Sequence, residues 1–385
     1  MSYSRREFGK LALAGLPAAA LLGRGDSVLG AWAAQAKPDS LIDGVQIGAI
    51  TYSYRSMPDQ SAEATLKYLL DSGLSGCELM DGPAEMFAGR PQAAGRGAGP
   101  GGFGGGRRGQ PPALEPGPGQ KLAEWNGQQC LVSADTGQPV PPAGFGGGGR
   151  GRGQQTPEQI AEQQEAAKKL KEWRTSVPMD RFKQLRAMYK DAGVTIYAYK
   201  TDGMQKNMQT SDEELDYMFN VAAAVGATHT TMELPTGADA EAMLKRMSSF
   251  AEKHKVAIAY HTHLQGSMTA FDQAFAISKW NMSNVDLGHW VAGGNQGGSP
   301  LDFLTKYHDR TASFHLKDRT TPQHCGLNLP WGTGETPIKP ILQLVKKNKW
   351  KMPASIELEY NVPEGSDAVQ EVKKCVDFCR QALTT

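Results

Sequence analysis

Short stretches rich in β-branched and aromatic residues alternate with longer amphipathic stretches, and polar turns separate them. From residue 45 onward this unit of strand and helix occurs eight times. Regular alternation predicts parallel strands covered by helices, and eight units predict a closed (β/α)8 TIM barrel rather than an open doubly wound sheet. The predicted strands are VQIGAITYSY (45–54), GCELM (76–80), VTIYAY (194–199), THTTMELP (228–235), VAIAYHTH (256–263), NVDLGHW (284–290), TASFHLKD (311–318) and PASIELEY (353–360).

The amphipathic stretches between these strands have the spacing of helices with one buried face. The stretch that follows Asp212 ends before Gly226, and glycine is a frequent helix stop. No G-x-G-x-x-G follows the first strand, so nothing favours a dinucleotide-binding domain. The helices that we expect with clear bounds are 62–72, 182–192, 212–225, 239–255 and 366–383.

One segment, residues 83–177, departs from this pattern after the second strand. It contains GRGAGPGGFGGGRRGQPP and GFGGGGRGRGQQTP, and it is far longer than the usual loop of a few residues. Such a composition cannot bury a core, so we expect a mobile, partly disordered insertion that ends in the polar helix TPEQIAEQQEAAKKLKEW. The Arg-Gly runs resemble RNA-binding tails, but their position on the ligand-facing rim of a barrel favours a linker or a lid.

The composition is that of an ordinary globular protein, with 39% hydrophobic residues and a net charge of +1 in 385 residues. A duplex nucleic-acid binder normally presents a strongly basic face, and a polybasic membrane-surface protein does as well. The near-zero net charge therefore argues against binding to nucleic acid or to a membrane surface. We expect a small-molecule substrate instead. A homo-oligomer is compatible with the sequence.

The five cysteines form no C-x-x-C pair and no cluster with metal-finger spacing. An odd number cannot all pair within one chain, and Cys375 and Cys379 lie one helical turn apart, which is a poor geometry for a disulfide. We therefore expect unpaired or packed thiols.

The N-terminus looks like a twin-arginine export signal. Arg5 and Arg6 precede a mildly apolar stretch that is shorter than the ~20 residues of a membrane span, and Ala31 and Ala33 form an A-x-A site. We expect a signal peptide over residues 1–33 and a mature barrel over residues 34–385. The mature protein would then be periplasmic and would lack a stable membrane anchor.

Chargeable side chains gather where the late strands end, and in a barrel of this kind the active site is built from those ends. Side chains two positions apart on a strand share a face, so three pairs are expected to point into the barrel: His261 with His263, His315 with Lys317, and Glu357 with Glu359. The residues concerned are Glu233, His261, His263, Asp286, His289, His315, Lys317, Glu357 and Glu359. So many carboxylates and imidazoles in one mouth would repel and desolvate one another, and a divalent cation relieves both effects. Asp, Glu and His without a thiolate suit Mn²⁺, Co²⁺, Mg²⁺, Fe²⁺ or Zn²⁺, and the sequence does not choose among them.

Five motifs in order, YHTH, DLGHW, HLKD, WGTGE and IELEY, resemble the xylose isomerase-like family of sugar isomerases and epimerases. In that family a Glu, an Asp, a His and a second Glu on late strands hold one divalent metal. The resemblance implies Asp286 and His315 as ligands, with the last Glu at Glu359 or Glu357, of which Glu359 is favoured slightly. Many members place their first Glu on the fifth strand, where this chain has His261 and His263. The fourth ligand is therefore one of these histidines or Glu233, with His263 and Glu233 preferred.

The resemblance implies proton transfer beside a metal-polarised carbonyl of a sugar or keto-sugar. Candidates for the base are Glu233, Glu357 and His263, and Lys317 is placed to stabilise a developing oxyanion. His289, at the D-x-x-H spacing, and His261 are expected to contact the substrate. Export argues against a phosphorylated sugar, and we interpret the turn at Gly332 and Gly334 as structural.

Two other functions remain open at the level of the sequence. The first is a 3-keto-glycoside lyase or hydratase. The second, from another class, is a metal-bearing sugar-binding protein without turnover.

Overall fold

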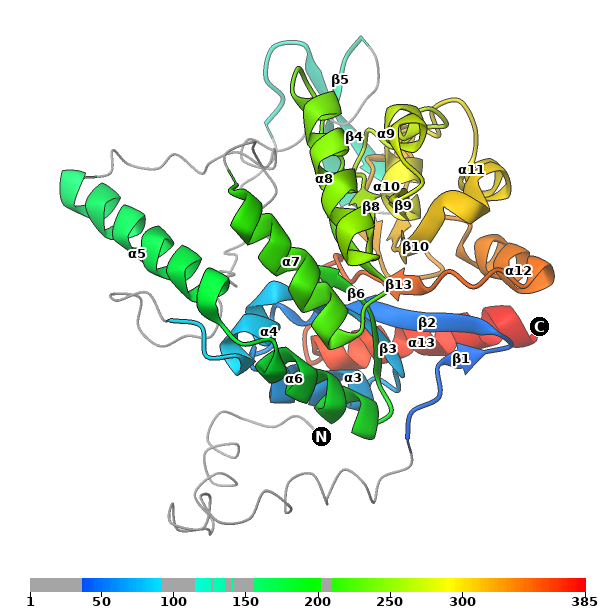
Figure 1. Ribbon diagram of the computed structural model, residues 1–385. Coiled ribbons are helices and arrows are strands. Elements are labelled where there is room, and N and C mark those ends of the chain that lie inside the picture. Colours follow the sequence, from blue (N-terminus) through cyan, green and yellow to red (C-terminus); the bar gives the residue numbers. More distant parts are fainter. Residues whose placement is uncertain (1–36, 92–114, 126–127, 136–139, 141–155, 202–209) are drawn as a thin grey trace.

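The computed structural model describes residues 37–91, 115–125, 128–135, 140, 156–201 and 210–385. Eight of the described strands pair in parallel in the order β2-β13-β10-β9-β8-β7-β6-β3, and β3 pairs back onto β2, which closes the barrel (Figure 1). The predicted TIM barrel is thereby confirmed. The strands are β2 (Val45–Ile50), β3 (Gly76–Met80), β6 (Thr195–Lys200), β7 (His229–Glu233), β8 (Ala257–His261), β9 (Asn281–Asp286), β10 (Thr311–Leu316) and β13 (Ala354–Ile356).

Helices surround the strands, and their ends follow local sequence rules. Ser211 caps α7 in a capping box with Glu214, and the helix ends at Gly226, whose φ of +81° is the left-handed conformation that glycine adopts without strain. The helices that follow or flank the barrel strands are α3 (Ala62–Asp71), α6 (Asp180–Asp191), α7 (Asp212–Val225), α8 (Ala240–His254), α9 (Asp272–Ile277), α10 (Leu287–Ala292), α11 (Pro300–Tyr307), α12 (Ile338–Asn348) and α13 (Ala368–Thr384).

The lower interior of the barrel is packed rather than hollow. Tyr197 and Ser355 share a hydrogen bond of 2.5 Å between their hydroxyl groups, and His229 Nε2 lies 2.8 Å from Ser313 Oγ. Gly48 lies against the Tyr197 ring, where a Cβ would come within 2.5 Å of the phenol oxygen. These contacts fill the floor of the barrel, so that a substrate can approach only from the carboxyl ends of the strands.

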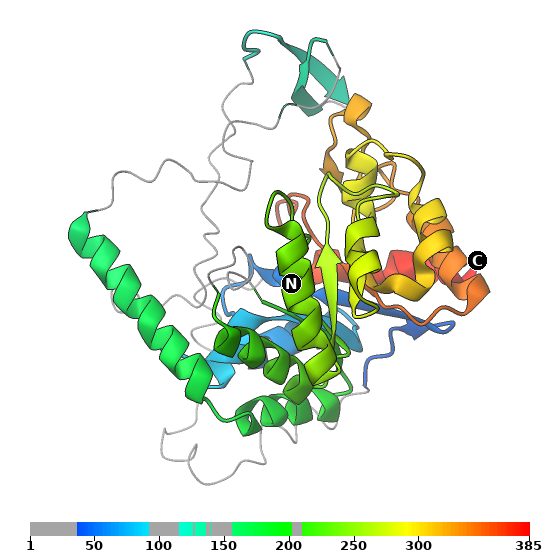
Figure 2. The same cartoon turned by 45° about the horizontal axis from the view of Figure 1, so that its top comes forward.

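The segment between β3 and β6 contains helix α4 (Asp81–Phe87), the antiparallel hairpin of β4 (Gln120–Trp125) and β5 (Gln128–Ser133), and helix α5 (Pro157–Ser176). The predicted polar helix corresponds to α5, which projects away from the barrel in Figures 1 and 2. Its last turn is attached through Arg174, whose Nε lies 2.8 Å from the buried Glu85 carboxylate. The two glycine-rich runs fall largely in 92–114 and 141–155, so their expected mobility concerns residues outside the described part of the chain.

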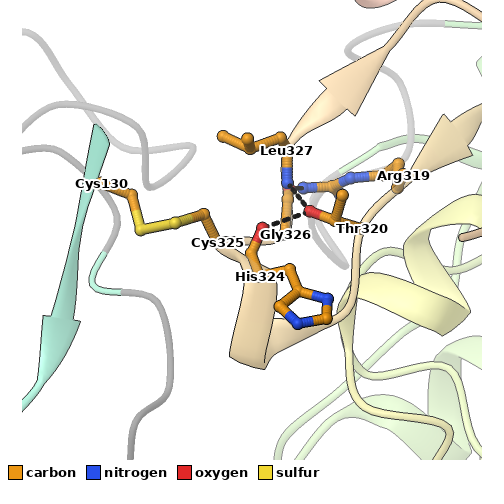
Figure 3. The surroundings of a disulfide bond; sticks show 7 residues. All are labelled: Cys130, Arg319, Thr320, His324, Cys325, Gly326 and Leu327. Carbon is orange, nitrogen blue, oxygen red and sulfur yellow. Dashed lines mark hydrogen bonds between the residues drawn. A yellow bond between two sulfur atoms is a disulfide. The ribbon is translucent and has the colours of Figure 1, made fainter. Parts of the chain in front are cut away.

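The expectation that the cysteines are all unpaired is wrong for two of them. Cys130 of β5 and Cys325 form a disulfide, with Cα atoms 5.8 Å apart, although 195 residues separate them in sequence (Figure 3). No spacing rule could reveal this pair, because only the fold brings the hairpin to the loop after β10. Cys77, Cys375 and Cys379 are free and buried, as expected.

The twin-arginine segment, residues 1–33, lies outside the described part of the chain. Among the residues that are described, none of the helices is both long enough and apolar enough to span a bilayer.

Candidate active site

Four side chains from four successive strands meet at the carboxyl end of the barrel. His261 ends β8, Asp286 ends β9, His315 lies near the end of β10, and Glu357 follows β13. All four are buried, and each offers one nitrogen or oxygen atom within 4.8 Å of the others. This group of residues is called the quartet below.

His315 lies between two carboxylates. Its Nε2 is 2.8 Å from Glu78 Oε2 and its Nδ1 is 2.7 Å from Glu357 Oε2, while Asp286 Oδ2 is 4.0 Å from Nδ1. Burial alone would lower the pKa of His315, but the charges of Glu78 and Glu357 outweigh it and raise that pKa to about 10. A cation that bound at Nδ1 would therefore have to displace a proton.

Glu78 is a site residue that the sequence analysis missed. It is fully buried in β3, where its carboxylate also accepts a hydrogen bond of 2.6 Å from Thr231 Oγ1. Burial would raise its pKa, but the charge of His315 outweighs burial and lowers the pKa to about 2. The available signal was an acidic residue in the middle of the short, otherwise apolar strand GCELM.

His261 is held as a neutral ring. Its Nδ1 lies 3.0 Å from Asn284 Oδ1, which leaves Nε2 for another partner. Burial first, and then the charge of Lys200, lower the pKa of His261 to about 3. A neutral imidazole with one nitrogen fixed by a hydrogen bond is the form in which histidine binds metals.

Lys317 lies among three carboxylates. Its Nζ is 3.0 Å from Asp286 Oδ2, 2.9 Å from Glu357 Oε2 and 2.7 Å from Glu359 Oε2. Burial opposes the ammonium charge, but the three carboxylates outweigh burial and raise the pKa of Lys317. The ammonium thus neutralises acidic side chains that would otherwise repel one another.

Glu233 stands at the edge of the mouth. Its Oε1 accepts a hydrogen bond of 3.1 Å from Lys200 Nζ, and its Oε2 lies 3.4 Å from His263 Nδ1. Burial would raise the pKa of Glu233, but Lys200 and the two nearby histidines outweigh it and lower the pKa to about 2. The Glu233 side chain is 37% exposed, so an ionised carboxylate reaches the solvent side of the site.

His289 lies in α10, which begins where Asp286 Oδ1 accepts a 2.6 Å hydrogen bond from the His289 amide. Its Nδ1 lies 2.5 Å from Arg319 Nη1, and its Nε2 is 3.7 Å from Glu359 Oε2. A guanidinium can only donate, so Nδ1 is the acceptor and the proton of the neutral ring is on Nε2. His261, His263 and His289 also lie close enough to form a group of three, but in this tautomer His289 offers a donor to the mouth rather than a lone pair.

The quartet fits a divalent cation. It supplies two imidazoles and two carboxylates without a thiolate, and the charge on the buried Asp286 Oδ2 is met by the Lys317 ammonium, 3.0 Å away. The predicted ligands Asp286 and His315 belong to the quartet, whereas Glu233 and His263 pair at the rim and Glu359 contacts Lys317. His261 and Glu357 complete the quartet. The sequence analysis gave them substrate and catalytic roles and kept both as alternative ligands.

The fold and the quartet define a TIM-barrel protein with a buried cluster of residues that could hold a metal ion. The family model of the xylose isomerase-like TIM barrel matches residues 160–381, which is more than half of the chain. The chain therefore belongs to the xylose isomerase-like TIM barrel family. Among curated proteins, none matches the sequence.

Solved structures with the same fold include enzymes of several kinds. A sugar phosphate isomerase/epimerase from Parabacteroides distasonis has 13% identity and a TM-score of 0.50, over 91% of this chain and 97% of its own. The 3-keto-D-glucoside 4-epimerase from E. coli has 9% identity and a TM-score of 0.50, over 88% and 99%. A probable 3-DHS dehydratase from Bacillus anthracis has 12% identity and a TM-score of 0.50, over 86% and 98%. At these identities the likeness concerns the fold.

Proposed function

We propose that this protein is a divalent-metal-dependent isomerase or epimerase that moves a proton beside the carbonyl of an unphosphorylated sugar or keto-sugar. The observation that carries the proposal is the convergence of His261, Asp286, His315 and Glu357 within 4.8 Å at the carboxyl end of the barrel. These four residues would hold the ion. A divalent ion bound there supplies a Lewis acid that polarises a carbonyl and acidifies the neighbouring C–H bond.

Two carboxylates outside the quartet would move the proton. Glu233 ends β7 and Glu359 follows β13, and these strands lie opposite each other in the closed barrel order. Bases on opposite sides of a bound sugar are what an epimerase needs to remove a proton from one face and return it to the other. Glu233 is the stronger candidate, because its Oε2 accepts no hydrogen bond from the described residues, whereas Glu359 Oε2 is paired with Lys317 at 2.7 Å.

Lys317 and His289 are donors beside the same carboxylates. The Lys317 ammonium can donate to an oxygen on which negative charge develops when the C–H bond breaks. His289 presents an Nε2–H group toward the mouth, where it can donate to a sugar hydroxyl. His263 is half exposed beside Glu233 and can contact the same substrate.

The turn at Gly332 and Gly334 supports an unphosphorylated substrate. Glycine-rich turns after late barrel strands can bind phosphate through their backbone amides. Here the amides of Gly332 and Gly334 both donate to Asp318 Oδ2, at 2.8 and 2.9 Å, and the Thr336 amide donates to Asp318 Oδ1. The carboxylate of the chain itself thus takes the place of a phosphate.

The disulfide between Cys130 and Cys325 supports a periplasmic location. Disulfides persist in oxidising compartments, and the twin-arginine pattern of residues 1–33 suggests export in the folded state. A free carbohydrate is then the expected partner, rather than a sugar phosphate or a nucleic acid.

Metal analysis and proton exchange together test the proposal. Purified mature protein should contain one divalent ion per chain, and Asp286→Ala and His315→Ala should lose it. Incubation with ketoses and 3-keto-glucosides in D₂O should place deuterium beside the carbonyl, as seen by NMR, and Glu233→Gln should slow that exchange while keeping the metal.

Other outcomes of the same experiment would replace the proposal. A product that has lost or gained water would identify a 3-keto-glycoside lyase or hydratase. Sugar binding that persists in Glu357→Gln and Glu359→Gln, with no exchange in the wild type, would identify a binding protein without turnover.

A further inference from the structure

The hairpin of β4 and β5 is attached to one particular loop at the rim of the barrel. Figure 2 shows it above the segment that follows β10, far from the floor of the barrel. The attachment has two parts: the disulfide between Cys130 and Cys325, and the Trp125 indole, which stacks on the His324 ring with centroids 3.7 Å apart. These four residues are called the latch below.

The loop under the latch is closely hydrogen bonded. Thr320 Oγ1 donates to the His324 carbonyl at 2.5 Å and accepts from the Leu327 amide at 2.7 Å (Figure 3). Glu335 accepts from the Thr321 amide at 2.6 Å and lies 2.9 Å from His324 Nδ1. Movement of His324 or Cys325 would therefore be transmitted to the whole turn.

Arg319 connects this loop to the active site. One arm of its guanidinium, Nη2, donates to the carbonyl of Gly326, the residue that follows Cys325 (Figure 3). The other arm, Nη1, donates to His289 Nδ1 at 2.5 Å. Only Gly326 and one guanidinium lie between the disulfide and the histidine that faces the mouth.

Cys325 itself occupies an unusual backbone position. Its φ of +74° lies in the left-handed region, where a non-glycine residue is disfavoured. A glycine would relieve this conformation but could not form the bridge. The conformation of this loop is thus tied to the disulfide.

We infer that the latch positions the active site: by fixing the Gly326 carbonyl it holds Arg319, and Arg319 fixes His289 as the tautomer that donates from Nε2. Arg319, Cys130 and Cys325 are positioning residues in this arrangement, because none of them needs to touch the substrate. The placement of His289 follows from the structure alone. Its consequence for sugar binding also rests on the proposed function.

The direct test observes the ring of His289. The ¹⁵N signals of histidine-labelled protein, assigned with His289→Gln, should show a proton on Nε2 in the oxidised wild type. Cys130→Ser/Cys325→Ser and Arg319→Lys should both give a mixture of tautomers. Dithiothreitol should have the same effect on the wild type, since it reduces the bridge to two thiols and is itself oxidised to a cyclic disulfide.

Two controls separate the latch from general damage. Dithiothreitol should change nothing further in Cys130→Ser/Cys325→Ser, because the other cysteines are already free thiols. Leu122→Ala, an exposed position on the same strand as Trp125, should leave the His289 signals unchanged, whereas Trp125→Ala should shift them. Identical His289 signals in oxidised and reduced wild type would overturn the inference.

Activity gives a separate readout. With a sugar that undergoes exchange, loss of the latch should raise KM about tenfold while kcat and bound metal stay near their wild-type values. An equal fall in kcat with unchanged KM would contradict positioning of a substrate contact. If no sugar undergoes exchange, the proposed function fails, but the ring signals still decide whether the latch positions His289.

Discussion

Glu78 Oε2 and His315 Nε2 lie 2.8 Å apart, and both side chains are completely buried. Their strands, β3 and β10, are not neighbours in the barrel, so this contact crosses its interior. The carboxylate fixes the ring so that Nδ1 faces Glu357 and Asp286. This is the arrangement in which an outer carboxylate orients a metal-binding histidine.

Replacing Glu78 by Gln should weaken metal binding without removing any member of the quartet. Loss of an orienting carboxylate typically lowers metal affinity about 10 to 100-fold. Isothermal titration of the chelated protein with Mn²⁺ or Zn²⁺ would measure the change. Glu371→Gln is the matched control, because Glu371 is a buried carboxylate on α13 that bonds Tyr360 and Lys374, and its loss should leave metal affinity unchanged.

The same pair predicts how the stability of the metal-free protein depends on pH. The folded pKa of His315, about 10, lies above its ordinary 6.5, so its contribution is complete below about 6.5 and is lost as pH rises toward 10. The folded pKa of Glu78, about 2, lies below its ordinary 4.5, so its contribution is complete above about 4.5 and is lost as pH falls toward 2. The free energy of unfolding of wild type minus that of Glu78→Gln, measured in urea with a chelator, should therefore be greatest between about pH 4.5 and 6.5. A difference that does not vary with pH would contradict the ionised pair.

Lys317→Met should destabilise the metal-free protein and make it more responsive to metal. Removing one partner of a buried ion pair typically costs about 3 to 5 kcal/mol, because the remaining charges are left unpaired. Here Asp286, Glu357 and Glu359 would lose their shared cation, and an added divalent ion should restore part of the stability.

Urea unfolding with and without Mn²⁺ would measure both effects. Lys346→Met is the control, since Lys346 pairs with Asp43 at the surface and its loss should cost no more than about 1 kcal/mol. If Mn²⁺ stabilises wild type and Lys317→Met equally, the Lys317 ammonium does not neutralise the carboxylates that a metal ion would neutralise.

Deleting residues 91–154 together with Cys325→Ser should leave a barrel that unfolds cooperatively. Val132 is buried in the hairpin, but no described residue of this segment belongs to the hydrophobic cluster of the barrel, whereas α5 contributes Trp173 and remains in the deleted chain. Thermal unfolding should give one transition near that of the reduced full-length protein. A broad transition, or loss of near-ultraviolet circular dichroism, would show that the segment supports the core.

Local sequence patterns predicted the barrel and part of the candidate site. Strand and helix alternation predicted the barrel because each period reports which face of an element is buried. The strand-end rule placed Asp286 and His315 in the mouth, since parallel strands bring their carboxyl ends to one rim. Local patterns mark Glu78 as an acidic residue in an apolar strand, but they could not report that it contacts His315 from across the barrel or that Arg319 contacts His289.

The sequence by itself determined the eightfold repeat and the inventory of acids and imidazoles on the late strands, because these depend on periods of a few residues. Only the tertiary structure decided which of these side chains lie close enough to contact one another or a common ion. Strand stagger and closure bring His261 and Glu357 beside Asp286 and His315, and direct Glu359 to Lys317. The same long-range folding joins Cys130 to Cys325, because a contact between residues so far apart depends on where the whole chain runs rather than on its local pattern.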